Sequence, residues 1–161
     1  MSIVRYTLTR YRNICLPGGI EGSNKPSQMD TVFVNGEVVH EDTFRQFHSR
    51  LRVKINRSYV IKHQYADCFS SDTPMPWVPT AAAGLTANLF PGPTRNLWTL
   101  FNGRPKTYTG VVLIVPHRPG AKYRDAWNDK PLTPTIEQGM AKIVLTLDPQ
   151  QPGCVVQDWS P

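Results

Sequence analysis

Proline is the feature that most restricts how this chain can fold. The sequence has 15 prolines among 161 residues, whereas an average usage of about 5% predicts roughly eight. Because proline fixes φ and lacks an amide hydrogen, it interrupts both helices and sheet ladders. The composition therefore predicts a loop-rich domain of short elements and argues against a helical bundle. Five prolines punctuate the centre of the chain: Pro74, Pro76, Pro79, Pro91 and Pro93.

Before this centre, hydrophobic periodicity predicts strands. In "HSRLRVKINR" (48–57) basic and aliphatic side chains alternate with a period of two, which predicts one long strand over residues 44–55. Asn35-Gly36 lies between two β-branched runs, and this arrangement predicts a hairpin turn.

Three later segments also predict strands. "TYTGVVLIVP" (107–116) contains a continuous apolar run that a proline ends, which is typical of a buried strand. "MAKIVLTLDP" (140–149) alternates as a half-buried strand does, and "CVVQDWSP" (154–161) predicts a last strand at a sheet edge. Residues 121–139, between these segments, are predicted to form an irregular excursion from the sheet.

The proline-rich centre predicts two short helices. Thr80 is a candidate cap for "AAAGLTANLF" (81–90), and Thr94 for "RNLWTLF" (95–101). The predicted fold class is therefore α+β, a single domain with an antiparallel β-sheet and two short helices in a long central insertion. Because "PGGIEGSNKPS" has the composition of a linker, we expect an N-terminal arm and linker over 1–27 and the globular domain over 28–161.

Charge and cysteine content restrict the partners and the compartment. The formal net charge of +6 predicts attraction to phosphate on nucleic acid or on anionic lipid. The three cysteines, Cys15, Cys68 and Cys154, are odd in number and lie far apart, without the spacing of metal ligands. This pattern argues against a zinc site or a disulfide framework and is typical of a protein from a reducing compartment. No apolar run approaches the length of a membrane span, so any membrane contact is expected to be peripheral.

Motifs of enzymes are missing from the sequence. It has no GxSxG, GxxxxGK[ST], HExxH or GxGxxG pattern, and its four histidines are scattered singly. We therefore expect a binding or structural protein with no metal and no cofactor. A nuclease built on His117 or His63 with loop acids is the third alternative.

Two sets of residues are candidate contact sites. The first is the row of basic side chains in the predicted strand, where residues two positions apart lie about 6.6 Å apart on one face. This spacing suits contacts with phosphates or lipid headgroups, although the solvent-exposed face of an ordinary strand has the same pattern. Trp77, between two prolines, is predicted either to fill the core or to meet a partner. The basic surface comprises His48, Arg50, Arg52, Lys54, Arg57 and Lys62, and the interface candidates are Arg5, Arg10, Arg12, Trp77 and Arg118.

Four stretches over residues 44–148, in this order, resemble rhabdovirus matrix proteins. They are "FHSRLRVKINRSYVIKHQYADC", similar to the basic strand of that family, "TRNLWTLFNG", similar to its second helix, "VVLIVPHRPG", and "PTIEQGMAKIVLTLD". The long lysine-rich tail and the PPxY or PTAP budding motifs of animal-virus relatives are missing, and the loop "NGRPKT" is short and polar. The resemblance is therefore to the small, plant-infecting, cytorhabdovirus-like type.

The resemblance implies a matrix protein that self-associates in a helical lattice, coats and condenses the nucleocapsid, and links it to the envelope. The implied partners are the viral nucleoprotein, other copies of the chain, and an anionic membrane or the tail of the envelope glycoprotein, with direct RNA binding secondary. The implied location is the virion beneath the envelope, and the host cytoplasm and peripheral membrane. The main alternative is a small viral coat protein that packages RNA directly.

Overall fold

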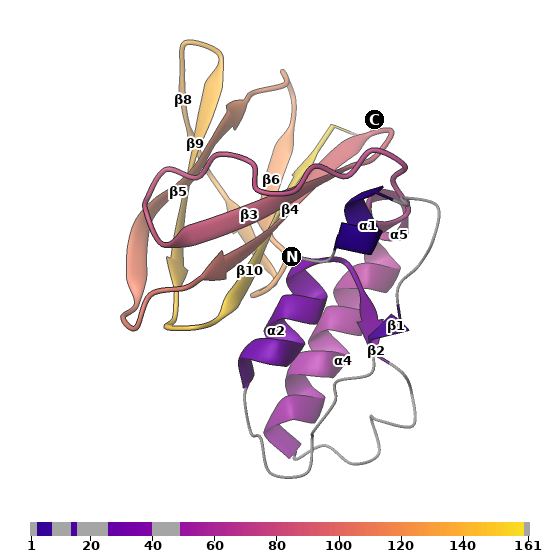
Figure 1. Ribbon diagram of the computed structural model, residues 1–161. Coiled ribbons are helices and arrows are strands. Elements are labelled where there is room, and N and C mark those ends of the chain that lie inside the picture. Colours follow the sequence, from indigo (N-terminus) through magenta and orange to yellow (C-terminus); the bar gives the residue numbers. More distant parts are fainter. Residues whose placement is uncertain (1–2, 8–13, 16–25, 40–48, 160–161) are drawn as a thin grey trace.

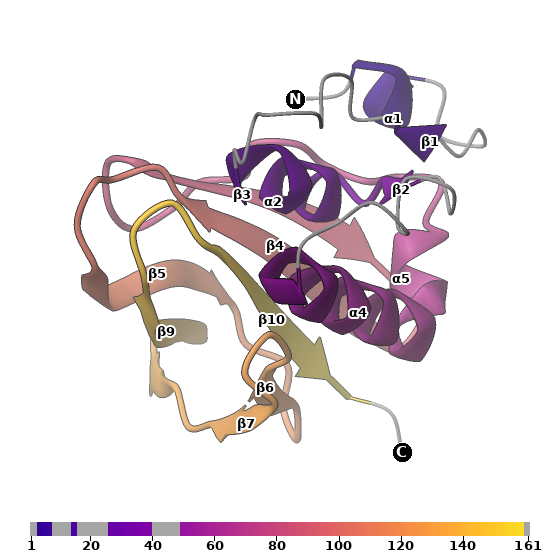
Figure 2. The same cartoon turned by 90° about the horizontal axis from the view of Figure 1, so that it is seen from below.

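The computed structural model describes residues 3–7, 14–15, 26–39 and 49–159, and it has three layers (Figures 1 and 2). The middle layer is an antiparallel five-stranded sheet in the order β3-β4-β10-β6-β7. Its strands are β3 (Leu85–Pro91), β4 (Arg95–Asn102), β10 (Pro152–Asp158), β6 (Lys122–Asp125) and β7 (Lys130–Leu132).

The outer layers lie on opposite faces of this central sheet. One is an antiparallel three-stranded sheet in the order β5-β9-β8, formed by β5 (Tyr108–Pro116), β9 (Met140–Leu147) and β8 (Thr135–Glu137). The other is helical (Figure 2). It contains α1 (Ile3–Thr7), α2 (Pro26–Val34), α4 (Ser49–Gln64) and α5 (Ala66–Phe69), beside a short parallel pair, β1 (Ile14–Cys15) and β2 (Val38–Val39).

Two hydrophobic cores fill the spaces between the layers. Successive side chains of a strand point to opposite faces, so β4 sends Trp98 and Leu100 toward the small sheet and Leu97 toward the helices. Strand β10 divides in the same way, with Val155 in the first core and Val156 in the second. The central sheet is therefore covered on both faces, and the α+β class is confirmed.

The long basic strand predicted over 44–55 is wrong where the structure describes it, because residues 49–64 form helix α4. Residues 44–48 lie outside the described part. Ile55 and Ile61 are buried, whereas Val53 and Val60 are 61% and 64% exposed. The alternation extends over only about ten residues, and the buried positions of the longer segment follow the helical repeat.

The two short helices predicted in the central insertion are also wrong. Residues 85–91 and 95–102 form strands β3 and β4, which pair as a hairpin with Leu85 opposite Asn102. The amide of Gly92 donates to the carbonyl of Arg95 (2.8 Å) in the connection. Because β4 is covered on both faces, its sequence has no period of two, and its apolar residues resemble one side of a helix.

Asn35-Gly36 does not form the predicted hairpin but ends helix α2. Gly36 has φ +69°, its amide donates to the carbonyl of Phe33, and the amide of Glu37 donates to the carbonyl of Val32, both at 2.9 Å. These two bonds define a Schellman motif. Both a type I′ turn and this cap require a left-handed residue, so the same dipeptide suits either structure.

The remaining strand predictions are mostly confirmed. Strands β5 and β9 occupy the segments predicted over 107–116 and 140–149. The last predicted strand exists as β10, but it lies between β4 and β6 rather than at an edge. The segment predicted as an irregular excursion contains the three short strands β6, β7 and β8.

Candidate functional site

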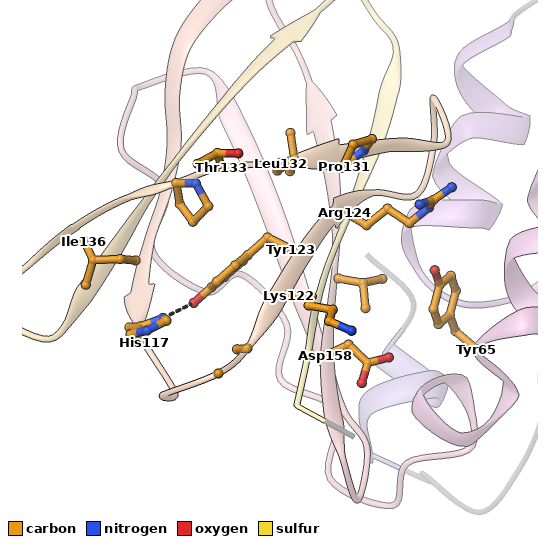
Figure 3. Close-up of a pocket in the computed structure, with 14 residues that line it drawn as sticks. Tyr65, His117, Lys122, Tyr123, Arg124, Pro131, Leu132, Thr133, Ile136 and Asp158 are labelled. Carbon is orange, nitrogen blue, oxygen red and sulfur yellow. Dashed lines mark hydrogen bonds between the residues drawn. The ribbon is translucent and has the colours of Figure 1, made fainter. Parts of the chain in front are cut away.

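A cavity of about 660 Å³ opens beside strand β6, where the central sheet and the small sheet end (Figure 3). It combines aromatic and aliphatic side chains with charged and hydroxyl groups, a composition typical of sites for small ligands. Among the described residues that line it are Tyr65, His117, Lys122, Tyr123, Arg124, Leu132, Thr133, Ile136 and Asp158.

A hydrogen-bond chain orients His117 at this cavity. The side-chain amide of Gln157 donates to the carbonyl of Pro116 (2.9 Å) and to the hydroxyl oxygen of Tyr123 (2.8 Å). Because the carbonyl of Pro116 can only accept a hydrogen bond, the atom of the Gln157 side chain that faces it must be the nitrogen. The hydroxyl of Tyr123 forms a hydrogen bond with Nδ1 of His117 at 2.9 Å (Figure 3). When the hydroxyl is the donor, a neutral His117 carries its hydrogen on Nε2.

Burial favours the protonated form of Tyr123 in this chain. Tyr123 is buried, and its burial raises the pKa of the phenol above the usual value, although the bond from Gln157 acts in the opposite direction. The phenol is therefore protonated at neutral pH and can serve as the donor in the bond to His117.

Charged groups lie on the side of the cavity near helix α4. Nε of Arg124 donates to the carboxylate of Asp129 (3.0 Å), and Nη1 of Arg95 lies 3.6 Å from the carboxylate of Asp158. Lys122 is exposed on the same strand as Arg124. Asp158 is the one carboxylate among the described lining residues.

The predicted basic surface does not form a single row. Successive residues of a helix are rotated by about 100°, so Arg52 and Lys54 point in different directions from α4. Lys54 forms an ion pair with the buried Asp30 at 3.2 Å, and Lys62 points inward to the backbone carbonyl of Glu37. The guanidinium of Arg57 lies 5.5 Å from the ring centre of Trp127. His48 and the side chain of Arg50 lie outside the described part.

The interface candidates are also separated. Arg5 is fully buried and donates from Nη2 to the carbonyl of Phe69 at 2.8 Å. The guanidinium of Arg118 lies 4.1 Å from the ring centre of Trp159. Trp77 is 67% exposed, so of its two predicted roles the core-filling one is excluded. Arg10 and Arg12 lie outside the described residues.

The inward position of Lys62 predicts a pH-dependent stability. Its Nζ lies 5.8 Å from the ring centre of Phe33, and burial lowers the pKa of Lys62 to about 7, while the charge of Glu37 opposes this shift. Above pH 7 the unfolded chain binds more protons at this site than the folded one, so stability rises with pH.

We expect the free energy of unfolding to increase by about 1 kcal/mol between pH 7 and pH 8. Urea denaturation at both values measures it, and Lys62→Met should remove the increase. An equal increase in the variant would contradict this origin.

The sequence did not single out most of the cavity. Among the residues that line it, the sequence predicts a role only for His117, as part of the alternative nuclease site. The sequence around the other lining residues has little hydrophobic periodicity. Tyr123 and Arg124 lie in the short strand β6, and Asp158 is the last residue of β10. The alternation in "KYRD" was the one available signal, and four residues are too few to distinguish a strand from a loop.

Two general findings concern membranes and metals. None of the described helices combines the length and the apolar character that a bilayer span requires. In the same part of the chain, no three His, Cys, Asp or Glu side chains gather as a group that could hold a metal ion.

No protein-family model and no curated protein matches this sequence. Two solved structures share its fold. One, assigned as an α-N-acetylgalactosaminidase of Bacillus halodurans, aligns with a TM-score of 0.55 and 11% identity over 83% of this chain and 31% of that chain. The other, assigned as an α-galactosidase of Bacteroides fragilis, has a TM-score of 0.56 and 9% identity over 84% of this chain and 28% of that chain. This chain therefore spans about a third of their length, and the likeness concerns the fold alone.

Proposed function

We propose that this chain is a non-catalytic, saccharide-binding β-sandwich module. The observation that carries the proposal is the cavity beside β6, in which oriented polar groups face apolar side chains. The similar structures also support the proposal, because in two proteins assigned as glycosidases about a third of the chain has this fold.

The chemistry of the cavity suits a sugar ring. Each sugar hydroxyl both donates and accepts hydrogen bonds, and the cavity offers donors on His117 and Lys122 and an acceptor on Asp158. The aliphatic side chains of Leu132 and Ile136 suit the C–H face of a pyranose. A pocket of mixed apolar walls and a few placed polar groups is typical of small-molecule sites.

The number of carboxylates at the cavity favours saccharide binding over hydrolysis. Most glycosidases use two carboxyl groups, about 5–10 Å apart, on either side of the scissile bond. Among the described residues that line this cavity, Asp158 alone supplies one, and it faces Arg95 at 3.6 Å. The arrangement therefore supports recognition of a saccharide rather than its cleavage.

The proposal predicts that galactose or N-acetylgalactosamine binds at this cavity. These two sugars are chosen because the two proteins that share the fold are assigned to act on their α-linked forms. NMR titration should move the amide signals of residues that line the cavity. His117→Ala should weaken binding about tenfold, since loss of one bound hydrogen-bond donor costs about 1.4 kcal/mol.

The matched control is Lys106→Ala, which removes an exposed cation from a loop outside the cavity and should leave the affinity unchanged. Lys122→Ala tests the cavity by a second route, since Lys122 is exposed and its loss does not disturb the core. Signal changes confined to other surfaces, or none with either sugar, would contradict the proposal.

The viral matrix function remains a second proposal, supported by the net charge of +6. The segments that resemble the basic strand and the second helix of that family are helix α4 and strand β4. Flotation of the protein with anionic vesicles, with and without competing single-stranded RNA, tests this function against the coat-protein alternative.

A further inference from the structure

The segment before β3 presents Trp77 through a β-bulge. β3 is an edge strand of the central sheet (Figure 1). Met75 exchanges two backbone hydrogen bonds with Leu89, each at 2.8 Å, and the amide of Val78 donates to the carbonyl of Ala87 at 2.9 Å. Two residues, Pro76 and Trp77, therefore lie opposite the single residue Asn88. This two-against-one pairing is a bulge, and bulges redirect side chains.

The backbone of Trp77 is held in an unfavourable conformation. Its φ is +53°, in the left-handed region that bulky residues avoid. The amide of Trp77 donates to Oδ1 of Asn88 at 3.0 Å. Asn88 is itself buried, and its Nδ2 donates to the carbonyl of Val34 in the helical layer at 2.9 Å. The core thus fixes the conformation that directs the indole outward.

Protection of the sheet edge does not explain an indole at this position. Pro76 and Pro79 already prevent the segment from pairing with a further strand, because proline has no amide to donate. A glycine would adopt the same φ without strain. The chain nevertheless places there its largest side chain, and leaves 67% of it exposed.

The surroundings of the indole suit a narrow ligand. Among the described residues, Met75 is the one other exposed large apolar side chain of this segment. Thr73, Thr80 and Ala81, which flank it, are small. A stable protein interface buries about 800 Å² on each partner around an apolar centre, whereas one exposed flat ring, with small residues on either side of it in the segment, matches the face of a single sugar.

We propose that Trp77 is a stacking platform for one pyranose ring of an extended saccharide, separate from the cavity beside β6. This platform rests on the proposed saccharide-binding function, and it extends that function from single sugars to polymers. The indole provides the apolar surface, and the ring C–H groups of the sugar lie against it. The bulge and Asn88 hold the indole in place before the saccharide arrives.

Affinity electrophoresis through gels that contain galactomannan tests the platform. We expect the polymer to retard the wild-type protein, and Trp77→Gly to weaken the apparent affinity about tenfold. Trp77→Phe should retain most of the retardation, because a phenyl ring can stack in the same way. Since glycine relieves the left-handed strain, Trp77→Gly should also raise the melting temperature by about 2–4 °C.

The matched control is Gln138→Gly, which relieves a φ of +50° at an exposed turn and should not change the retardation. Equal retardation of wild type and Trp77→Gly, or none of the wild type, would overturn the platform. Trp77-dependent self-association without retardation would assign the ring to a protein contact and would also overturn it. Titration with free galactose reports on the cavity alone, so the two proposals can fail separately.

Discussion

Asn102→Ala is expected to lower the free energy of unfolding by about 3 kcal/mol, because several buried polar groups lose their partner. Asn102 is fully buried at the end of β4. The two hydrogens on its Nδ2 are shared among the carbonyls of Lys106, Leu147 and Asp148, each 3.0 Å from the nitrogen. Its Oδ1 accepts from the amide of Arg104 at 3.0 Å.

The contact with Leu147 joins the two sheets, and the other three hold the loops that follow β4 and β9. Asn102 belongs to the central sheet, while Leu147 ends β9 of the small sheet. Alanine would leave the carbonyls without this donor in a place that water reaches poorly, and an unmade buried hydrogen bond costs about 1–3 kcal/mol. The amide side chain therefore stabilises the closed end of the sandwich more than a typical surface asparagine does.

Urea denaturation measures the loss, with Asn96→Ala as the control. Asn96 lies on the same strand, opposite Gln157, and is half-buried. We expect this control to lose less than about 1 kcal/mol. Similar losses for the two variants would show that the bridge between the sheets contributes little.

Gly36→Ala is expected to destabilise the protein by about 2–4 kcal/mol, through two effects. The residue has φ +69°, so any Cβ strains the backbone of the helix cap. An added Cβ would also lie 2.9 Å from two ring carbons of Phe90 and 3.3 Å from the ring of Phe69. Phe90 is fully buried and cannot move without disturbing the core.

Gly120→Ala separates these effects. Its φ is +78°, but an added Cβ would meet nothing within 4 Å. This control should therefore show only the backbone strain, about 1 kcal/mol. Thermal or urea unfolding of both variants gives the difference, which is attributable to the ring contact. Equal losses would mean that the core around Phe90 accommodates an extra methyl group.

Periodicity predicted those strands whose two faces differ or whose ends are marked. Strand β9 alternates between Ile143, Leu145 and Leu147, all buried, and exposed residues such as Val144. Strand β5 ends at Pro116, as the sequence predicts. Local residues carry enough information in both segments, because successive positions of β9 differ in polarity and a proline marks the end of the apolar run in β5.

The candidate site was less accessible to such reasoning. The cavity gathers residues from the turn after α4, the loop after β5, and strands β6, β7, β8 and β10, which together span the chain from Tyr65 to Asp158. His117 acquires its orientation from Gln157 and Tyr123, and no local pattern links these three residues. Trp77 was identified from its prolines, but its exposure depends on a bulge that only pairing with β3 reveals.

The sequence by itself determined the α+β class, the strands β5 and β9, and the need for a left-handed residue at Gly36. Tertiary structure alone decided that 49–64 is a helix, that Gly36 caps a helix instead of turning a hairpin, and that β3 and β4 are strands. The physical reason is that a short apolar pattern specifies which side chains need cover but not what covers them. For β4 a helix layer and a second sheet cover both faces, and this double burial removes the alternation from which a strand is predicted.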